Sequence, residues 1–380
     1  MSDTLSVSVP KDRSDESWTR REILQQPETL RATQALLRMR QRAIDAFLTP
    51  LLARDDLRII LTGAGTSAFI GESLAPWLSV TMDRRVEAIP TTDIVSAPHL
   101  HLRTDVPTLV VSCGRSGSSP ESVAAVELVD ALVGSAHHLV VTCNAEGELA
   151  RRTGANTHVV VLPEATHDRA YAMTSSFTAM MFAVLSIFTG IDTMDERAEA
   201  IANAVAETVA TAEPQMGALA GRDFDRVVYL GSGLFKGLAR EAALKLLELT
   251  DGALVTAFDT ALGFRHGPKT IITDRTLVVV FVSNDSLTRG YDLDIIEELR
   301  GDGQSGAVLA ISAQPIDGEA LQVPSLARAA DVDLLFPYIV PAQLFGLEAS
   351  LRLGLAPDLP NASGTVSRVV QGVRIHAIGA

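Results

Sequence analysis

One pattern occurs twice along the chain and constrains its fold more than any other feature: a short buried strand that runs into Gly-x-Gly and then into a helix. It stands at Gly63-Ala64-Gly65 and again at Gly231-Ser232-Gly233, and a second strand with a polar end follows each copy. Strands that alternate with helices indicate a parallel α/β sheet, and recurrence along the chain indicates a duplicated unit. The sequence therefore predicts two similar α/β domains with a boundary near residue 205.

The expected strands are short apolar runs rich in Val, Ile and Leu. They are RIILTGAG, PTLVVSC, HHLVVTCN and THVVVLP in the first half, and RVVYLGSG, TLVVVFVS, AVLAISA and VDLLFP in the second. Helical apolar spacing predicts a helical lead-in up to about Leu52, broken by Pro27, and a helical bridge from about Asp192 to Ala220. We expect a mobile polar tail and helices over 1–54, a first domain over 55–204 and a second over 205–380, each in three layers.

Charge and composition exclude several classes of protein. A formal net charge of -14 argues against a nucleic-acid surface, which needs a basic patch. The opening MSDTLSVSVPKDRSDESW has no basic and then apolar run, so we expect no signal peptide and a cytoplasmic protein. The uncharged stretch Tyr171 to Gly190 is long enough for a membrane span, but its many Ser and Thr residues favour a buried core helix. No membrane partner is expected.

The first glycine turn carries hydroxyl groups. Thr66 and Ser67 follow it where a helix would start, and backbone N–H groups and hydroxyls at such a position form an anion site. A dinucleotide fold is the alternative, but the turn is not G-x-G-x-x-G and the acidic residue that contacts a ribose is missing. We therefore expect no nucleotide cofactor.

A second hydroxyl-rich loop, SCGRSGSSPES, also follows a buried strand. Its serines are Ser112, Ser116, Ser118, Ser119 and Ser122. In an open parallel sheet ligands bind beyond the carboxyl ends of the strands, so both loops would face one site, and a phosphate is the simplest ligand. Read alone, this segment is equally well a Ser/Gly-rich surface loop.

Taken in order, GAGTS, SCGRSGSSPES, VTCN and YAMTSSF resemble the sugar-isomerase (SIS) domain and the isomerase half of glucosamine-6-phosphate synthase. This resemblance implies two tandem SIS domains in which Ser/Thr loops hold the 6-phosphate of a sugar. By motif it implicates Thr66, Ser67, Ser116 and Ser119, and also Thr174 or Ser175. One departure is Gly114, which stands where the family pattern has a serine.

In the second half, Glu241, Lys245 and Glu248 are spaced i, i+4 and i+7, so on a helix all three share one face. Such spacing more often marks a solvated ion pair, and a histidine such as His266 is more often structural. However, LAREAALKLLELTDGALVTAFDTALGFRHGPKTII resembles the isomerase's catalytic stretch. The resemblance implies that Glu248 moves a proton between C1 and C2, that His266 assists ring opening, and that Lys245 and Glu241 support the charge.

Two further positions bear on the site. Gly263 replaces a glutamate of the relative, so a substrate or partner contact differs there. The tail LPNASGTVSRVVQGVRIHAIGA parallels one that closes over the relative's site, with Arg368 about where that relative has a reactive lysine; an ordinary edge strand is the alternative. Arginine does not form a Schiff base, so its expected role is charge and hydrogen bonding. The other histidines and Cys113 and Cys143 lack ligand spacing, so we expect no metal and no disulfide.

With FRHGPKTII, TRGYDLDIIEELR and the RVVQGV tail, the chain most resembles the group of tagatose-6-phosphate ketose/aldose isomerases, also described as galactosamine-6-phosphate deaminases. The synthase's glutaminase domain has no counterpart, so glutamine is not expected as a nitrogen source. The preferred interpretation is a deaminase that forms tagatose 6-phosphate and ammonia, and plain isomerisation is the alternative. A non-catalytic phosphosugar-binding protein is the rival of another class. The resemblance implies a homodimer or homotetramer with a shared site.

Overall fold

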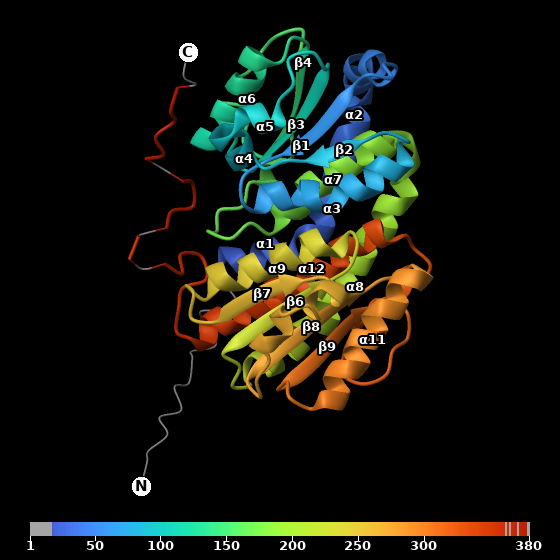
Figure 1. Ribbon diagram of the computed structural model, residues 1–380, viewed down its shortest axis with the longest axis vertical. Helices are drawn as coiled ribbons and strands as arrows, with labels where there is room; N and C mark the ends of the chain where they lie inside the picture. Colours follow the sequence, from blue (N-terminus) through green and yellow to red (C-terminus); the bar gives the residue numbers. More distant parts are fainter. Residues whose placement is uncertain (1–16, 362, 365, 371, 378–380) are drawn as a thin grey trace.

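The computed structural model describes residues 17–361, 363–364, 366–370 and 372–377, so the polar segment 1–16 lies outside the described residues. Two parallel five-stranded sheets form the upper and lower halves of the molecule, with helices between them (Figure 1). When the strands of each sheet are numbered in chain order, both sheets read 2-1-3-4-5. The predicted duplication is therefore confirmed at the level of topology.

The first sheet has the order β2-β1-β3-β4-β5. Its central strands are buried on both faces, which explains why they read as unbroken apolar runs. The strands are β1 (Arg58–Thr62), β2 (Val86–Ala88), β3 (Thr108–Gly114), β4 (Ala136–Thr142) and β5 (Thr157–Val161).

The second sheet has the order β10-β9-β8-β6-β7, and its edge strand β7 is partly exposed, with no fully buried residue. Its strands are β6 (Arg226–Gly231), β7 (Val255–Asp259), β8 (Thr276–Val282), β9 (Ala307–Ser312) and β10 (Ala320–Gln322). The three strands that the sequence did not reveal, β2, β7 and β10, are short or lie at sheet edges.

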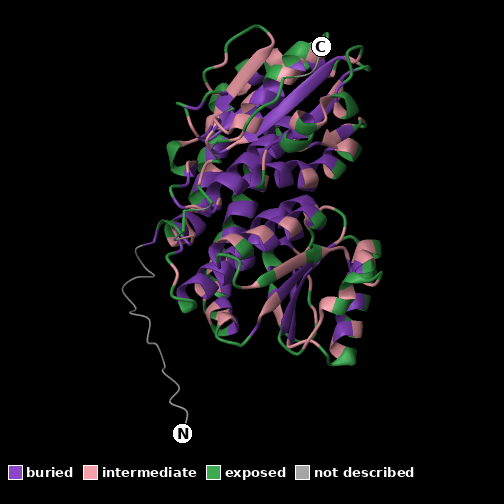
Figure 2. Ribbon diagram, turned by 60° about the vertical axis from the view of Figure 1, so that its left-hand side comes forward, coloured by how far each residue is buried: buried purple, intermediate pink, exposed green. Residues whose placement is uncertain are grey.

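The helices sort by the face that they cover. Helices packed between the sheets share one hydrophobic core that includes residues of both domains, and Figure 2 shows the buried residues concentrated there and in the strands. They are α1 (Trp18–Leu24), α2 (Gln26–Leu52), α3 (Thr66–Thr81), α7 (Ser175–Thr189), α8 (Asp195–Ala220), α9 (Phe235–Leu249) and α12 (Asp331–Arg352). The outer faces carry α4 (Thr91–Ser96), α5 (Pro98–His101), α6 (Pro120–Leu132), α10 (Ala261–Phe264) and α11 (Ser286–Asp302).

Two expectations about the helices are confirmed. Pro27 lies in the first turn of α2, where proline is well tolerated, and α1 ends just before it at Leu24. The stretch expected to be a buried core helix is α7, most of whose side chains are fully inaccessible. The boundary predicted near residue 205 lies within the continuous helix α8 and stays a prediction.

One expected strand is wrong. VDLLFP is not a strand but the start of α12, where Asp331 and Asp333 stand in the first turn and favour a helix N-terminus. A short buried apolar run does not distinguish a strand from a helix by periodicity, and every residue of this run is buried. Within the described chain, α12 is also the helix long and apolar enough to cross a membrane, and 89% of its apolar window is buried inside the protein.

Candidate active site

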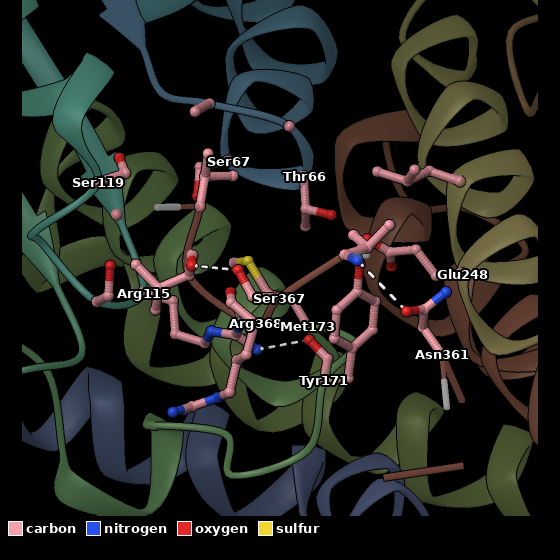
Figure 3. A pocket seen from close by; sticks show the side chains of 18 of the residues that line it. Thr66, Ser67, Arg115, Ser119, Tyr171, Met173, Glu248, Asn361, Ser367 and Arg368 are labelled. Atoms are coloured by element: carbon pink, nitrogen blue, oxygen red, sulfur yellow. Dashed lines mark hydrogen bonds between the residues drawn. The ribbon is translucent and has the colours of Figure 1, made fainter. Parts of the chain in front are cut away.

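A cavity of about 490 Å³ opens where the carboxyl ends of β1 and β3 meet, the position at which open α/β sheets bind ligands. Its walls come from the start of α3, the serine loop after β3, the last turns of α9, and the chain that follows α12 (Figure 3). The first domain contributes the hydroxyl groups, and the second contributes a carboxylate. The site therefore lies between the two domains of one chain.

The start of α3 forms the first wall. A Cβ at Gly63 would lie 2.6 Å from the Cβ of Ser67, so only glycine lets the helix begin this close to β1. Gly65 has φ of +54°, which turns the chain into the helix and leaves Thr66 and Ser67 as its first residues. Both side chains line the cavity.

The serine loop forms the second wall, and the end of β4 holds it in place. Thr142 Oγ1 donates to the Gly114 carbonyl at 2.7 Å, and Asn144 Nδ2 donates to the Ser116 carbonyl at 2.9 Å. Ser116 and Ser119 line the cavity, and the Ser119 hydroxyl donates to Ser122 Oγ at 2.6 Å. A β-carbon at Gly114 would make only ordinary contacts, so the serine of the family pattern is missing here without a steric reason.

The hydroxyls lie beside two helix N-termini. Ser67 is in the first turn of α3, and Ser119 is the N-cap of α6, whose next residue is Pro120. Each helix N-terminus carries partial positive charge and N–H groups that lack a partner within the helix. Two such ends with interleaved hydroxyls suit an anion such as a phosphate.

Helix α9 places Glu241, Lys245 and Glu248 on one face, as the spacing predicts. Lys245 Nζ contacts the Glu248 carboxylate and lies 3.6 Å from Glu241 Oε1. Lys245 and Glu241 are fully buried, whereas the Glu248 side chain is 21% exposed and lines the cavity. In the view of Figure 3, Glu248 and Ser119 occupy opposite sides of the pocket.

The two buried members of this group have shifted pKa values. Burial raises the pKa of Glu241 to about 8, and the nearby charge of Glu248 adds to the rise, although Lys245 opposes it. Burial alone would lower the pKa of Lys245, but the two carboxyl groups outweigh burial and raise it. The Lys245 ammonium is therefore held between two carboxyl groups, in direct contact with the one that reaches the cavity, Glu248.

Residue 361 and residues 366–370 close the remaining side, and the described chain after α12 to which they belong is here called the C-terminal tail. Asn361 Nδ2 donates to Asp251 Oδ1 at 2.7 Å just beyond α9, and Ser367 and Arg368 line the cavity. Arg368 donates to the carbonyls of Asp168 and Ala170. The structure thus brings Arg368 to the site together with the predicted hydroxyls.

Several predicted residues are not brought to this cavity. Thr174 and Ser175 are fully buried at the start of α7, where Asp168 already acts as the anion: its carboxylate accepts from Thr174 N at 2.8 Å and from Ser175 Oγ at 2.5 Å. His266 is exposed beyond α10 and lines no part of the cavity in the same chain. A Cβ at Gly263 would lie 2.5 Å from Asp259 Oδ1 and 2.8 Å from Thr260 Oγ1, so a side chain there requires these two side chains to shift.

Sequence reasoning missed Arg115 and Tyr171, which also line the cavity. Arg115 could have been found from the sequence. It is a charged residue between Gly114 and Ser116, directly after a buried strand, and a charge at such a position is a candidate contact for a ligand. Tyr171 stands in the YAMTSSF motif, but its contact with the cavity depends on how the loop before α7 folds back.

Proteins of known sequence and structure are similar to the chain over nearly its whole length. Residues 51–190 match the family model of the SIS domain. An AgaS protein of Streptomyces coelicolor is 49% identical over 95% of both chains, and the D-galactosamine-6-phosphate deaminase AgaS of Escherichia coli is 44% identical over 97% of this chain and 98% of its own. The crystal structure of tagatose-6-phosphate ketose/aldose isomerase from Escherichia coli matches with a TM-score of 0.90 at 41% identity, over 98% of this chain and 99% of that one.

Proposed function

The chain belongs to the family of two-domain SIS proteins that includes the AgaS deaminases, and we propose that it is an enzyme that deaminates a 2-amino-2-deoxyhexose 6-phosphate, galactosamine 6-phosphate first. The products are the ketose 6-phosphate, here tagatose 6-phosphate, and ammonia. The observation that carries this proposal is that one cavity combines a hydroxyl-lined anion site with a half-buried carboxylate backed by a buried lysine.

The two ends of the cavity match the two ends of such a substrate. Ser67, Ser116 and Ser119, together with two helix N-termini, suit the phosphate on C6. Glu248 lies across the pocket, where C1 and C2 of the open-chain sugar would reach (Figure 3). Thr66 lies between these two ends in the same view.

The chemistry needs a group that moves a proton between two carbons. Glu248 takes the proton from C2 of the open-chain amino aldose and returns it to C1, while a second proton passes from the amino group to O1, which leaves a C2 imine beside a C1 hydroxymethyl group. Water then adds to the imine, and the adduct collapses to the ketose and ammonia. Lys245 contacts the Glu248 carboxylate and keeps it in place, and burial favours the neutral form of Glu241 on the other side of Lys245.

A plain aldose–ketose isomerase is the second candidate, and the structural match to tagatose-6-phosphate ketose/aldose isomerase favours it. The same proton transfer on a 2-hydroxy sugar gives isomerisation without loss of nitrogen. A phosphosugar-binding protein without catalysis would have no use for the Glu248–Lys245 pair at the carbon end of the cavity.

Measuring ammonia and ketose 6-phosphate together, over a panel of hexose and hexosamine 6-phosphates, separates these functions. The proposal expects equal amounts of both products from galactosamine 6-phosphate. Ketose from hydroxy sugars with no ammonia from any hexosamine would show that the enzyme is an isomerase. Heat stabilisation by sugar phosphates without turnover would show a binding protein.

We further propose that the enzyme is a cytoplasmic homo-oligomer in which His266 serves the cavity of a neighbouring copy. His266 is exposed and stands outside its own cavity, and the adjacent apolar side chains Phe258 and Leu262 are 37% and 45% exposed. Exposed apolar side chains next to a polar functional group are typical of an interface. In that arrangement the imidazole would assist opening of the sugar ring.

Complementation between two inactive variants tests the shared site. Glu248→Gln and His266→Asn are each expected to lose turnover as separate oligomers. When they are co-expressed, mixed oligomers would contain sites in which both side chains are intact, so part of the activity should return. No recovery in oligomers shown to be mixed would place His266 and Glu248 in the same chain's site, or remove His266 from the reaction.

A further inference from the structure

Arg115 is a charged side chain built into the serine loop, yet only 6% of its surface is exposed. Its guanidinium donates to three backbone carbonyls: Ala170 at 3.1 Å, Tyr171 at 3.1 Å and Arg368 at 3.0 Å. Ala170 and Tyr171 belong to the loop before α7, whereas Arg368 belongs to the C-terminal tail. One side chain therefore joins the anion loop to two cavity walls that lie far away in the sequence.

A second cation stands beside it. The Arg368 guanidinium donates to the carbonyls of Asp168 and Ala170, so both arginines are hydrogen-bonded to the loop before α7. Among the residues that the structure describes, neither guanidinium has a carboxylate within 4 Å, and Asp168 is hydrogen-bonded to the first residues of α7. Burial lowers the pKa of Arg115 and repulsion from Arg368 lowers it further, whereas the more distant charges of Asp168 and Glu248 oppose this shift.

Two adjacent positive charges that have no carboxylate in direct contact are costly in a buried wall. Both arginines line the same cavity as Ser116 and Ser119, where an anion of two charges would offset them. Guanidinium groups suit this double task, since each has several N–H donors, some for carbonyls and the rest for a phosphate oxygen.

We propose that Arg115 is a positioning residue that fastens the C-terminal tail over the site, and that the phosphate of the substrate completes this fastening by neutralising the Arg115–Arg368 pair. Selectivity for phosphorylated sugars then comes partly from tail closure and not only from the serine hydroxyls. This inference rests on the proposed function only in taking the ligand to be a sugar phosphate.

Trypsin provides a direct measurement, because it cleaves after Arg368 when the tail is free. In the wild-type protein, 10 mM inorganic phosphate should slow cleavage after Arg368 by roughly tenfold, in line with hydrogen bonds to a charged group. In Arg115→Gln the same phosphate should give little protection. Arg374→Gln is the matched control, since it removes an exposed arginine of the same tail and should leave phosphate protection unchanged.

Arg115→Lys covers the case in which the glutamine variant does not fold. Lysine keeps the charge but does not span three carbonyls in two segments. Inorganic phosphate should still inhibit turnover of this variant, whereas cleavage after Arg368 should be as fast as without phosphate. Wild-type protection in a folded Arg115 variant would overturn the proposal.

Kinetics separate a positioning role from a general loss of structure. Arg115→Gln and Arg368→Gln should each raise KM about tenfold and change kcat by less than about threefold. Because they are expected to act as one unit, the double variant should raise KM far less than the roughly hundredfold of independent sites. Multiplicative effects would show that Arg115 acts on the phosphate without the tail. The trypsin result needs no turnover, so it stands even if the assays reject the proposed reaction.

Discussion

The two halves of the chain have the same strand order and the same glycine turn, but only the first half keeps the turn open to a ligand. Gly63 and Gly231 both let a helix start against its strand, and Gly65 and Gly233 both have positive φ, +54° and +58°. The residues that follow differ: Thr66 and Ser67 line the cavity in the first domain, whereas Phe235, at the position of Ser67, is buried in the core.

In the second domain the chain supplies its own anions. Asp292 of α11 accepts from Ser232 Oγ at 2.7 Å and from Ser283 N at 3.0 Å, and Asp331 accepts from Ser283 Oγ at 2.5 Å and from Asn284 N at 2.8 Å. These carboxylates satisfy the donors at the carboxyl ends of β6 and β8. The equivalent edge of the first sheet has a cavity and two arginines instead.

This contrast indicates how one architecture serves two purposes. A parallel sheet with helices presents N–H and hydroxyl donors at the carboxyl ends of its strands, and those donors need an acceptor. An internal carboxylate makes the place structural, and its absence makes the place a binding site. The second domain is then free to contribute through another element, the charged face of α9.

The largest expected effect comes from removing the charge of Glu248, the carboxylate that the second domain contributes to the cavity. Glu248→Gln should keep the fold and the affinity for inorganic phosphate but lose at least about a hundredfold in kcat, the usual scale for removing a general base. Glu207→Gln, an exposed change on α8, is the control for loss of a carboxylate elsewhere. Steady-state kinetics and phosphate inhibition measure both quantities, and near wild-type turnover would remove Glu248 from the reaction.

The next effect tests the internal anion of the second domain. Burial raises the pKa of Asp292 from its ordinary 3.8 to about 6, so the folded protein holds this proton more tightly than the unfolded chain. The resulting stabilisation is complete below about pH 4 and is lost as the pH rises through 6, a change on the order of 2 to 3 kcal/mol. Urea unfolding from pH 4 to 7 should show this loss in the wild type and lack it in Asp292→Asn.

A parallel measurement on Asp317→Asn, which alters an exposed loop aspartate, controls for the change in net charge. Groups that do not interact with Asp292 titrate equally in all three proteins, so the difference between the curves reports Asp292 and the neighbours that its charge affects, chiefly Asp331 and Arg289. Identical curves for the wild type and Asp292→Asn would mean that burial does not raise the pKa of this carboxyl in the folded protein.

Much of the fold was predictable because its signals are local. Runs of Val, Ile and Leu predict seven of the strands, and the glycine turns predict where the helices after β1 and β6 start. The prediction of a strand at VDLLFP was wrong because a fully buried run has no amphipathic period that distinguishes a helix from a strand. The edge strands β7 and β10 were invisible, since three to five partly exposed residues carry little pattern.

The site was predictable wherever a motif fixes the geometry. Turns and helical periodicity predict the loops Gly63 to Ser67 and Gly114 to Ser119 and the shared face of α9, and the family resemblance is what marked them as a site. What the sequence does not encode locally is which distant carbonyls or carboxylates reach a given donor. For that reason only the structure reveals that Asp168 accepts hydrogen bonds from the start of α7 and that Arg115 donates to the Arg368 carbonyl of the tail.

The smallest expected effects sharpen the comparison most, because they come from one kind of change made in both domains. Ser67→Ala removes a hydroxyl that faces the open cavity, so it should raise KM for the sugar phosphate roughly tenfold and leave the free energy of unfolding within about 0.5 kcal/mol. Ser232→Ala removes a hydroxyl that donates to the buried Asp292 carboxylate. It should lower the free energy of unfolding by about 1 kcal/mol and leave KM within roughly twofold, because no ligand is expected there. KM and urea unfolding are measured for both variants. Only KM should change clearly in Ser67→Ala, and only the free energy of unfolding should change clearly in Ser232→Ala. A rise of KM in Ser232→Ala would mean that the second domain's loop also binds substrate, and the contrast between an open and an internally filled anion site would then be wrong.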